Sequence, residues 1–133
     1  MSATTVIRQL LVGRATVLAS VPADCIRIGV LPQGTPLPAI GITTVSGVWR
    51  NTLSMAEPRR LMRERVQVTV HAKTYPELDR VIRLVAQALP NTRDTIANVD
   101  VLSIVASTIG PDLERIDPVI STRSLDYHVS YLW

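Results

Sequence analysis

Asp126 and His128, near the C-terminus, are the two side chains in this sequence best suited to acid–base chemistry. A carboxylate that orients an imidazole, with the serine hydroxyls of Ser124 and Ser130 close by, would be typical of a hydrolytic site. The segment alternates between polar and apolar residues, which predicts a β-strand. Side chains two apart on a strand lie ~7 Å apart and point the same way. Because that is too far for a direct hydrogen bond, the sequence favours a polar strand face over an enzyme.

Metal and cofactor sites are not indicated either. His71 and His128 are the two histidines of the chain, and they would be neighbours only if their strands pair. A metal would need further ligands that the spacing does not offer. Gly29 and Gly34 are separated by proline and precede no predicted helix, so they do not form a phosphate-binding loop. Cys25 is the single cysteine, which excludes an internal disulfide and is typical of a small buried residue. We therefore predict no catalytic, cofactor-binding or metal-binding residue.

Positive charge is concentrated in residues 50–65, whose net charge of +3 equals that of the whole chain. Arginine suits planar, bidentate contacts with carboxylate or phosphate, and a solvated loop is an equally good reading. Specific nucleic-acid recognition would need several aromatic side chains among the basic residues, and Trp49 alone lies near them. The basic residues of the segment are Arg50, Arg59, Arg60, Arg63 and Arg65, opposed by Glu57 and Glu64.

An acidic group lies before the last predicted strand, in Asp112, Glu114 and Asp117 around Arg115. In a ring of copies arranged head to tail, the arginine-rich segment of one subunit could meet this acidic turn of the next. The sequence therefore offers these charged residues as candidates for subunit interfaces.

The chain has 133 residues, which favours one domain with one core. Aromatic residues make up 4% and phenylalanine is absent, so the core must be built from aliphatic side chains. No apolar run approaches the ~20 residues that a transmembrane helix needs. The first residues also lack the basic and apolar regions of a signal peptide.

Hydrophobic periodicity predicts a single antiparallel or mixed sheet of about four to five strands with two main helices on one face, an α+β fold. In residues 65–72 and 120–133, apolar and polar side chains alternate, which predicts one buried and one polar face. Residues 47–64 have no clean period and predict either a mobile loop or an extended hairpin. The expected order begins with a helix at 4–19, weakened at Gly13, and two strands at 25–31 and 39–46 that flank a proline-rich connector. After the excursion at 47–64 come a strand at 65–72, a helix at 75–89, and strands at 99–108 and 120–133.

The helix at 75–89 has the clearest signals. Thr74 is a predicted N-cap, Glu77 completes a capping box, and Pro76 occupies the first turn, where its missing N–H is not needed. Its predicted buried stripe is Leu78, Val81, Ile82, Val85 and Leu89.

The order of four segments, at 12–13, 29–40, 65–78 and 123–131, resembles the tail-completion or tail-terminator proteins of long-tailed bacteriophages and related gene transfer agents. In sequence these are Val-Gly; Gly-Val-Leu-Pro-Gln-Gly followed by Leu-Pro-Ala-Ile; Arg-Val-Gln-Val-Thr-Val-His-Ala-Lys-Thr-Tyr leading to a leucine; and Arg-Ser-Leu-Asp-Tyr-His-Val-Ser-Tyr. They span nearly the whole chain.

The resemblance implies a structural virion protein, with residues 1–133 as a single domain. It would be made in a bacterial cytoplasm and form a hexameric ring at the head-proximal end of a tail tube. The ring would end tube polymerisation and join the tail to the head connector, and DNA would pass non-specifically through its lumen. Its expected partners are further copies of itself, the tube protein and the connector, with no membrane and no cofactor. The alternatives are another neck or head-closure adaptor and, less favoured, a small nucleic-acid-binding module or an enzyme.

Overall fold

A computed structural model describes residues 3–32, 34–50, 61–111, 113–116 and 119–132. A single mixed sheet of seven strands runs in the order β1-β2-β3-β7-β5-β4, and β6 also pairs with β7. The strands are β1 (Ile26–Ile28), β2 (Ala39–Arg50), β3 (Leu61–Ala72), β4 (Asp94–Ile96), β5 (Val99–Ile109), β6 (Leu113–Ile116) and β7 (Val119–Leu132). The helices are α1 (Ala3–Val12), α2 (Ala15–Ser20), the short 3-10 helix η1 (Ala23–Cys25) and α3 (Tyr75–Ala88).

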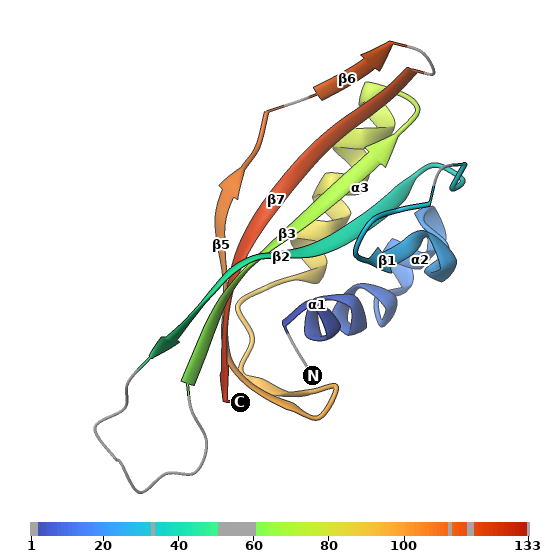
Figure 1. The fold of residues 1–133 in the computed structure, drawn as a ribbon. Helices are drawn as coiled ribbons and strands as arrows, with labels where there is room; N and C mark the ends of the chain where they lie inside the picture. The colour runs from blue at the N-terminus through green and yellow to red at the C-terminus, as the bar shows by residue number, and fades with distance from the viewer. Residues whose placement is uncertain (1–2, 33, 51–60, 112, 117–118, 133) are drawn as a thin grey trace, which may run out of the picture.

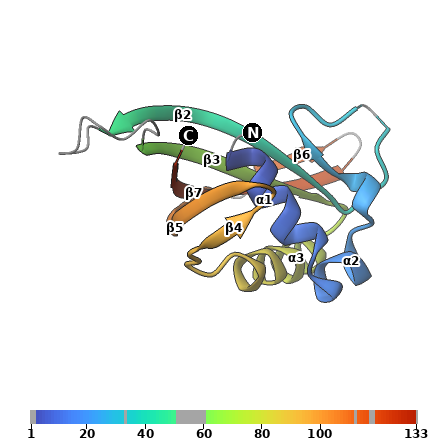
Figure 2. The ribbon, with the colours of Figure 1, turned by 90° about the horizontal axis from the view of Figure 1, so that it is seen from below.

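The sheet curls around the helices, which lie on its concave side (Figures 1 and 2). The α+β class and the mixed sheet agree with the sequence prediction, whereas the expected four to five strands and two main helices were too few. β4 and β6, of three and four residues, were missed because so few residues give no readable alternation. β6 falls where a turn was expected. None of the described helices is long and apolar enough to cross a membrane.

The N-terminal helical stretch breaks at Gly13, as its sequence indicated, so α1 and α2 are separate helices. Ile7 and Leu11 are fully buried, as expected from their spacing. In α2, however, Val17 is buried while Leu18 is 37% exposed. The break restarts the helix in a new direction, so the apolar period of α1 does not continue into α2.

β1 and β2 are parallel, and Ile26 lies opposite Ile40. The proline-rich connector between them is therefore a crossover that returns the chain to the same end of the sheet. Arg8 of α1 fixes the start of β1, because its guanidinium donates to the carbonyl oxygens of Ile26 at 2.9 Å and of Ala23 at 3.3 Å. The connection thus depends on a contact between residues that lie far apart in the sequence.

The excursion at 47–64 begins and ends as a hairpin. β2 continues to Arg50 and β3 starts at Leu61, and these two residues are opposite each other. Of the two expected conformations, the extended hairpin is therefore the one found in the described part of this segment. Residues 51–60 lie outside the described residues. β3 has the predicted alternation from Val66 to Ala72, and the same alternation extends back to Met62.

The helix α3 has the features read from its sequence. The backbone N–H of Glu77 donates to the Thr74 hydroxyl at 3.3 Å, so Thr74 is the N-cap. The Glu77 carboxylate accepts from the backbone N–H of Lys73, one residue before the N-cap. All five residues of the predicted apolar stripe are buried, and they join α3 to the sheet core.

Candidate functional site

The helices lie on one side of the sheet and leave its convex face uncovered (Figure 2). On that face, polar side chains of β3 and β7 form a continuous surface. We call this surface the polar face. The alternation in both strands was read from the sequence, and the antiparallel register brings the two polar sides together. The polar face consists of Arg63, Arg65, Gln67, Thr69 and His71 from β3 and Thr122, Ser124, Asp126, His128 and Ser130 from β7.

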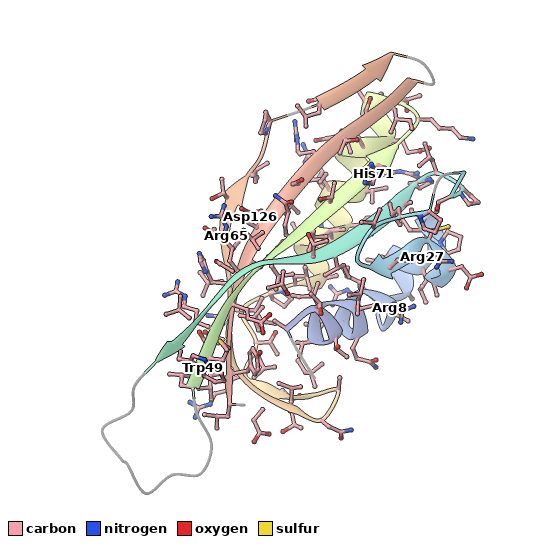
Figure 3. The ribbon with its side chains drawn as sticks, in the orientation of Figure 1. Arg8, Arg27, Trp49, Arg65, His71 and Asp126 are labelled. Carbon is pink, nitrogen blue, oxygen red and sulfur yellow. The ribbon has the colours of Figure 1, made fainter. Side chains whose placement is uncertain are left out.

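Asp126 is 6% exposed and is held by the neighbouring strand. Arg65 donates to its Oδ2 atom through Nε at 3.0 Å and also through Nη2, and Gln67 donates to Oδ1 at 3.4 Å. Figure 3 shows Arg65 and Asp126 side by side. The Asp126 carboxylate thus has a structural role within the sheet, in line with the polar-face interpretation of the sequence.

The two histidines lie on the same face but apart. His71 is opposite Thr122 and His128 is opposite Arg65, so the histidines are six positions apart along β3, or about 20 Å at ~3.3 Å per residue. Pairing of their strands therefore does not make them neighbours. Within the described part of the chain, no group of three or more His, Cys, Asp or Glu side chains could hold a metal.

Both histidines are held toward the neutral form. Partial burial lowers the pKa of His71 below its usual value. Burial also lowers the pKa of His128, and the positive charges of Arg63 and Arg65 add to that effect, against an opposing contribution from Asp126. Two neutral histidines far apart offer no general-base pair.

The remaining polar side chains bond across the two strands. Thr69 and Ser124 hydroxyls lie 3.1 Å apart, and the Thr122 hydroxyl lies 3.2 Å from Nδ1 of His71. These cross-strand pairs stabilise the register. The polar face is therefore a broad, internally bonded surface, which suits contact with another macromolecule better than capture of a small substrate.

The predicted interface residues are spread widely. Arg63 and Arg65 lie on the polar face, and Arg65 is already bound to Asp126. Arg50 ends β2 and Glu114 lies in β6, and the description of both is limited to the backbone. The others, Arg59, Arg60, Asp112 and Asp117, lie outside the described residues.

The residues that flank the two charged segments are at opposite ends of the sheet (Figure 1). Arg50 and Leu61 border the arginine-rich segment at one end, while Ile109 and Leu113 border the acidic turn at the other. A contact between these segments of neighbouring subunits would therefore need a large displacement of one copy along the strands.

One polar cluster was not found from the sequence. Glu64 is 6% exposed on the concave side of β3, where its carboxylate accepts from the Tyr131 hydroxyl and, at 3.2 Å, from the Thr44 hydroxyl. Burial, then the hydrogen bond to Glu64 and the charge of Glu64, raise the pKa of Tyr131 well above its usual value. The sequence contained a signal for this burial, because Glu64 lies an even number of residues from Val66 and Val68 and is therefore on the same side of the strand.

A shallow depression of about 420 Å³ lies between η1 and the proline-rich connector. Its polar lining includes Asp24 and Arg27, and the Arg27 guanidinium donates to the Asp24 carbonyl oxygen at 3.0 Å. Both polar contacts of the lining are local, since the Thr35 hydroxyl likewise donates to the nearby Pro32 carbonyl oxygen.

Comparison with known proteins gives a match in fold alone. No family model and no curated protein matches this chain. Among solved structures, a chain of the "Virion of native gene transfer agent (GTA) particle" is similar, with a TM-score of 0.72 and 10% identity, over 99% of this chain and 96% of that one. This chain has the fold of a virion chain. The likeness agrees with the broader part of the sequence resemblance, which included gene transfer agents, while assignment to the tail terminator is a finer proposal.

Proposed function

We propose that this chain is a structural virion protein that forms a hexameric ring at the head-proximal end of a phage-like tail tube. The ring ends polymerisation of the tube and joins the tail to the head connector. The observation that carries the proposal is the likeness in fold, along almost the full length of both chains, to a chain from a gene transfer agent virion. The order of sequence segments that resembles tail terminators supports it independently.

The described surface is compatible with such a role. Its acid and base side chains are bonded across strands rather than gathered around a reaction centre, as the Arg65–Asp126 pair illustrates. The polar face is broad, and no described helix covers it (Figure 2). A surface whose side chains are mostly polar and uncharged, and whose Arg65 and Asp126 charges offset each other, suits contact with other subunits or with passing DNA.

DNA in a lumen must move, and each lysine or arginine that contacts a phosphate adds affinity that depends on salt. Arg65 has its charge balanced by Asp126, and among the described residues no carboxylate forms a salt bridge with Arg63, the other arginine of the polar face. A single such charge per subunit is consistent with DNA that passes without tight binding.

For the charged segments we propose a second arrangement beside the lateral contact predicted from the sequence. Since their flanking residues mark opposite ends of the sheet, copies arranged side by side would present the arginine-rich segment toward one rim of the ring and the acidic turn toward the other (Figure 1). We propose that these segments contact the neighbouring components, the tube on one side and the head connector on the other.

The test is electron microscopy of particles produced without this gene. Heads without tails, accompanied by tails of abnormal length, are the expected result. Tails of normal length that fail to join heads would instead indicate a head-closure or adaptor protein. Intact, infectious particles would overturn the structural role altogether.

A further inference from the structure

Besides the short strands β1, β4 and β6, two long strands, β2 and β5, have an outer edge that is only partly paired in the described part of the chain. β1 pairs with β2 only at Ile40–Ile42, so no strand pairs with the outer edge of β2 over residues 43–48. β4 pairs with β5 only over residues 99–101, so no strand pairs with the outer edge of β5 over 102–109, where the Asn91 side chain accepts from the Ile104 N–H. Such edges present backbone N–H and C=O groups to any strand that approaches.

Neither open edge is protected by a charged side chain or a proline within it, although each contains a β-bulge. Native edges are commonly protected by charged side chains or proline. Residues 102–109 and residues 43–48 contain neither a charged residue nor a proline. Instead both edges expose apolar side chains, including Val48 at 58% and Val105 at 45%. Exposed apolar side chains on two edges without charge or proline point to strands that are covered in the assembled protein.

We propose that a second copy of this chain covers each edge, so that β2 of one subunit pairs antiparallel with β5 of the next and the sheet continues around the ring. This inference rests on the proposed ring and specifies how its subunits join. Within one chain, β2 and β5 run in opposite directions because three antiparallel pairings separate them. Copies related by rotation about an axis along the strands would therefore place β5 antiparallel to the next β2.

The contact is heterologous, since two different edges of the chain meet. Every copy then offers one β2 edge and one β5 edge, which is the requirement for a closed ring. A pairing of β2 with β2 would end at a dimer.

The register follows from the faces and the bulges. Val48 lies opposite Arg63 and Val105 lies opposite His128, so both valines are on the convex side of the sheet. Setting Val48 opposite Val105 places apolar against apolar on that side. In this register the bulge at Val45 of β2 and the bulge at Ser107 of β5 lie in the same short stretch of the paired strands. Each strand then has one extra residue there, so the same residue register holds before and after the bulges.

The hydrogen-bonding directions agree with this register. The Ile104 N–H points outward, because the Asn91 side chain accepts from it at 3.1 Å, so the Ala106 N–H also points outward by the period of two. On β2, the Ile42 carbonyl oxygen points outward and accepts from the Gly29 N–H at 2.8 Å. Counting every second residue, with one extra residue at the bulge, the backbone N–H and C=O of Gly47 also point outward. Gly47 and Ala106 would form a hydrogen-bonded pair. Val48 and Val105 would form the adjacent non-hydrogen-bonded pair, in which side chains are closest.

The experiment is disulfide cross-linking of assembled protein, in solution or, where rings form only on tubes, in purified particles. Cys25 is replaced by alanine, and Val48→Cys and Val105→Cys are combined. Mild oxidation is expected to give a ladder of covalent oligomers on a non-reducing gel that extends to the closed ring and disappears with reductant. The matched control combines Val48→Cys with Ile109→Cys, a more exposed apolar position of β5 on the opposite face, and is expected to give no ladder.

The possible failures are distinguishable. A ring seen by microscopy or mass measurement that yields no ladder would overturn the edge pairing while the proposed ring stands. Dimers from Val48→Cys alone would show a pairing of β2 with β2 and would also overturn it. Absence of any ring, in solution and on tubes, would overturn the ring and the pairing together.

A second variant tests the backbone contact without cysteine. Ala106→Pro removes a backbone N–H that points away from β7, so the hydrogen bonds between β5 and β7 within the subunit are retained. We expect loss of ring assembly with an unchanged circular dichroism spectrum, whereas Ala106→Thr should assemble normally. A folded Ala106→Pro protein that assembles like the parent would contradict the pairing. If this variant does not fold, the cross-linking result decides.

Discussion

Arg65 on β3 and Asp126 on β7 are diagonal neighbours, and the Arg65 guanidinium donates twice to the same Asp126 oxygen. The partners differ in exposure: the Arg65 side chain is 42% exposed and the Asp126 side chain is 7% exposed. The contact therefore serves mainly to satisfy a nearly buried carboxylate. It also removes Arg65 from the arginines available to a phosphate or to a neighbouring subunit.

Replacing Arg65 with alanine should destabilise the chain by about 1–3 kcal/mol, because Asp126 would be left with Gln67 as its remaining bonded side chain. Screening by water at the exposed guanidinium favours the lower end of that range. Urea denaturation of the unassembled chain measures the change. Arg63→Ala, two residues away on the same face, is the control and should change stability by less than about 0.5 kcal/mol. Equal losses in the two variants would mean that the Asp126 contact has no particular importance.

Tyr131→Phe should lower the free energy of unfolding by about 1–3 kcal/mol at neutral pH, since the buried Glu64 carboxylate loses a donor. The raised pKa of Tyr131 adds a dependence on alkaline pH. A folded-state pKa above the unfolded value of 10.0 means that stability is intact below pH 10 and falls as the pH rises further. Chemical denaturation between pH 8 and 11, roughly centred on that ordinary tyrosine pKa, should show this fall in the parent and less of it in the variant.

Tyr127→Phe provides the matched control, because burial alone raises the pKa of Tyr127 on the same side of β7. That variant should also reduce the alkaline dependence, yet it should leave stability at neutral pH almost unchanged. If Tyr127→Phe and Tyr131→Phe are equally destabilising at neutral pH, the Glu64 hydrogen bond is not the cause.

Acidification should destabilise the chain through its two histidines. Their folded-state pKa values lie below the unfolded value of 6.5, so the unfolded chain binds protons first. Stability is therefore expected to fall as the pH drops through 6.5 and to level off below the folded pKa values. His71→Gln and His128→Gln should each flatten the profile between about pH 7.5 and 5.5, a window chosen around the ordinary histidine pKa.

The two effects should add, because the histidines lie about 20 Å apart by strand geometry and share no partner side chain in the described contacts. The double variant is therefore expected to have the flattest profile. A double variant no flatter than either single one would show that the histidines are coupled, contrary to their separation.

Sequence patterns predicted the elements that are long and strictly periodic. The alternation in β3 and β7 defined both faces, and the Thr74 cap and apolar stripe defined α3. The same alternation could not give the register, since it says which face a side chain occupies and not which residue lies opposite. For that reason His71 and His128 could be placed on one face but not at their actual separation.

The missed features share a different cause, namely dependence on partners distant in sequence. Glu64 continues the buried side of β3, and only the approach of Tyr131 from β7 makes that burial acceptable. Arg8 secures β1 through carbonyl oxygens of Ala23 and Ile26, which no local pattern reveals. The open edges of β2 and β5 likewise became recognisable only once the strand order was known.

Charge reversal distinguishes the two possible roles of the arginine-rich segment. We expect Arg59→Glu with Arg60→Glu to leave the number of subunits in the ring unchanged but to reduce its attachment to the tail tube or the connector. The reason is that residues flanking this segment and residues flanking the acidic turn mark opposite ends of the sheet (Figure 1). Mass measurement of the purified ring and counts of joined particles by microscopy provide the two readouts.

The matched variant reverses the acidic turn, with Asp112→Lys and Asp117→Lys. If the two segments contact different components at opposite rims, each reversal weakens a different junction, and combining both reversals rescues neither. If instead the basic segment of one copy meets the acidic turn of the next, either reversal alone should break the ring and the combination should restore it. Restoration by the combined variant would therefore re-establish the lateral contact inferred from the sequence and would rule out a ring joined solely through the edges of β2 and β5.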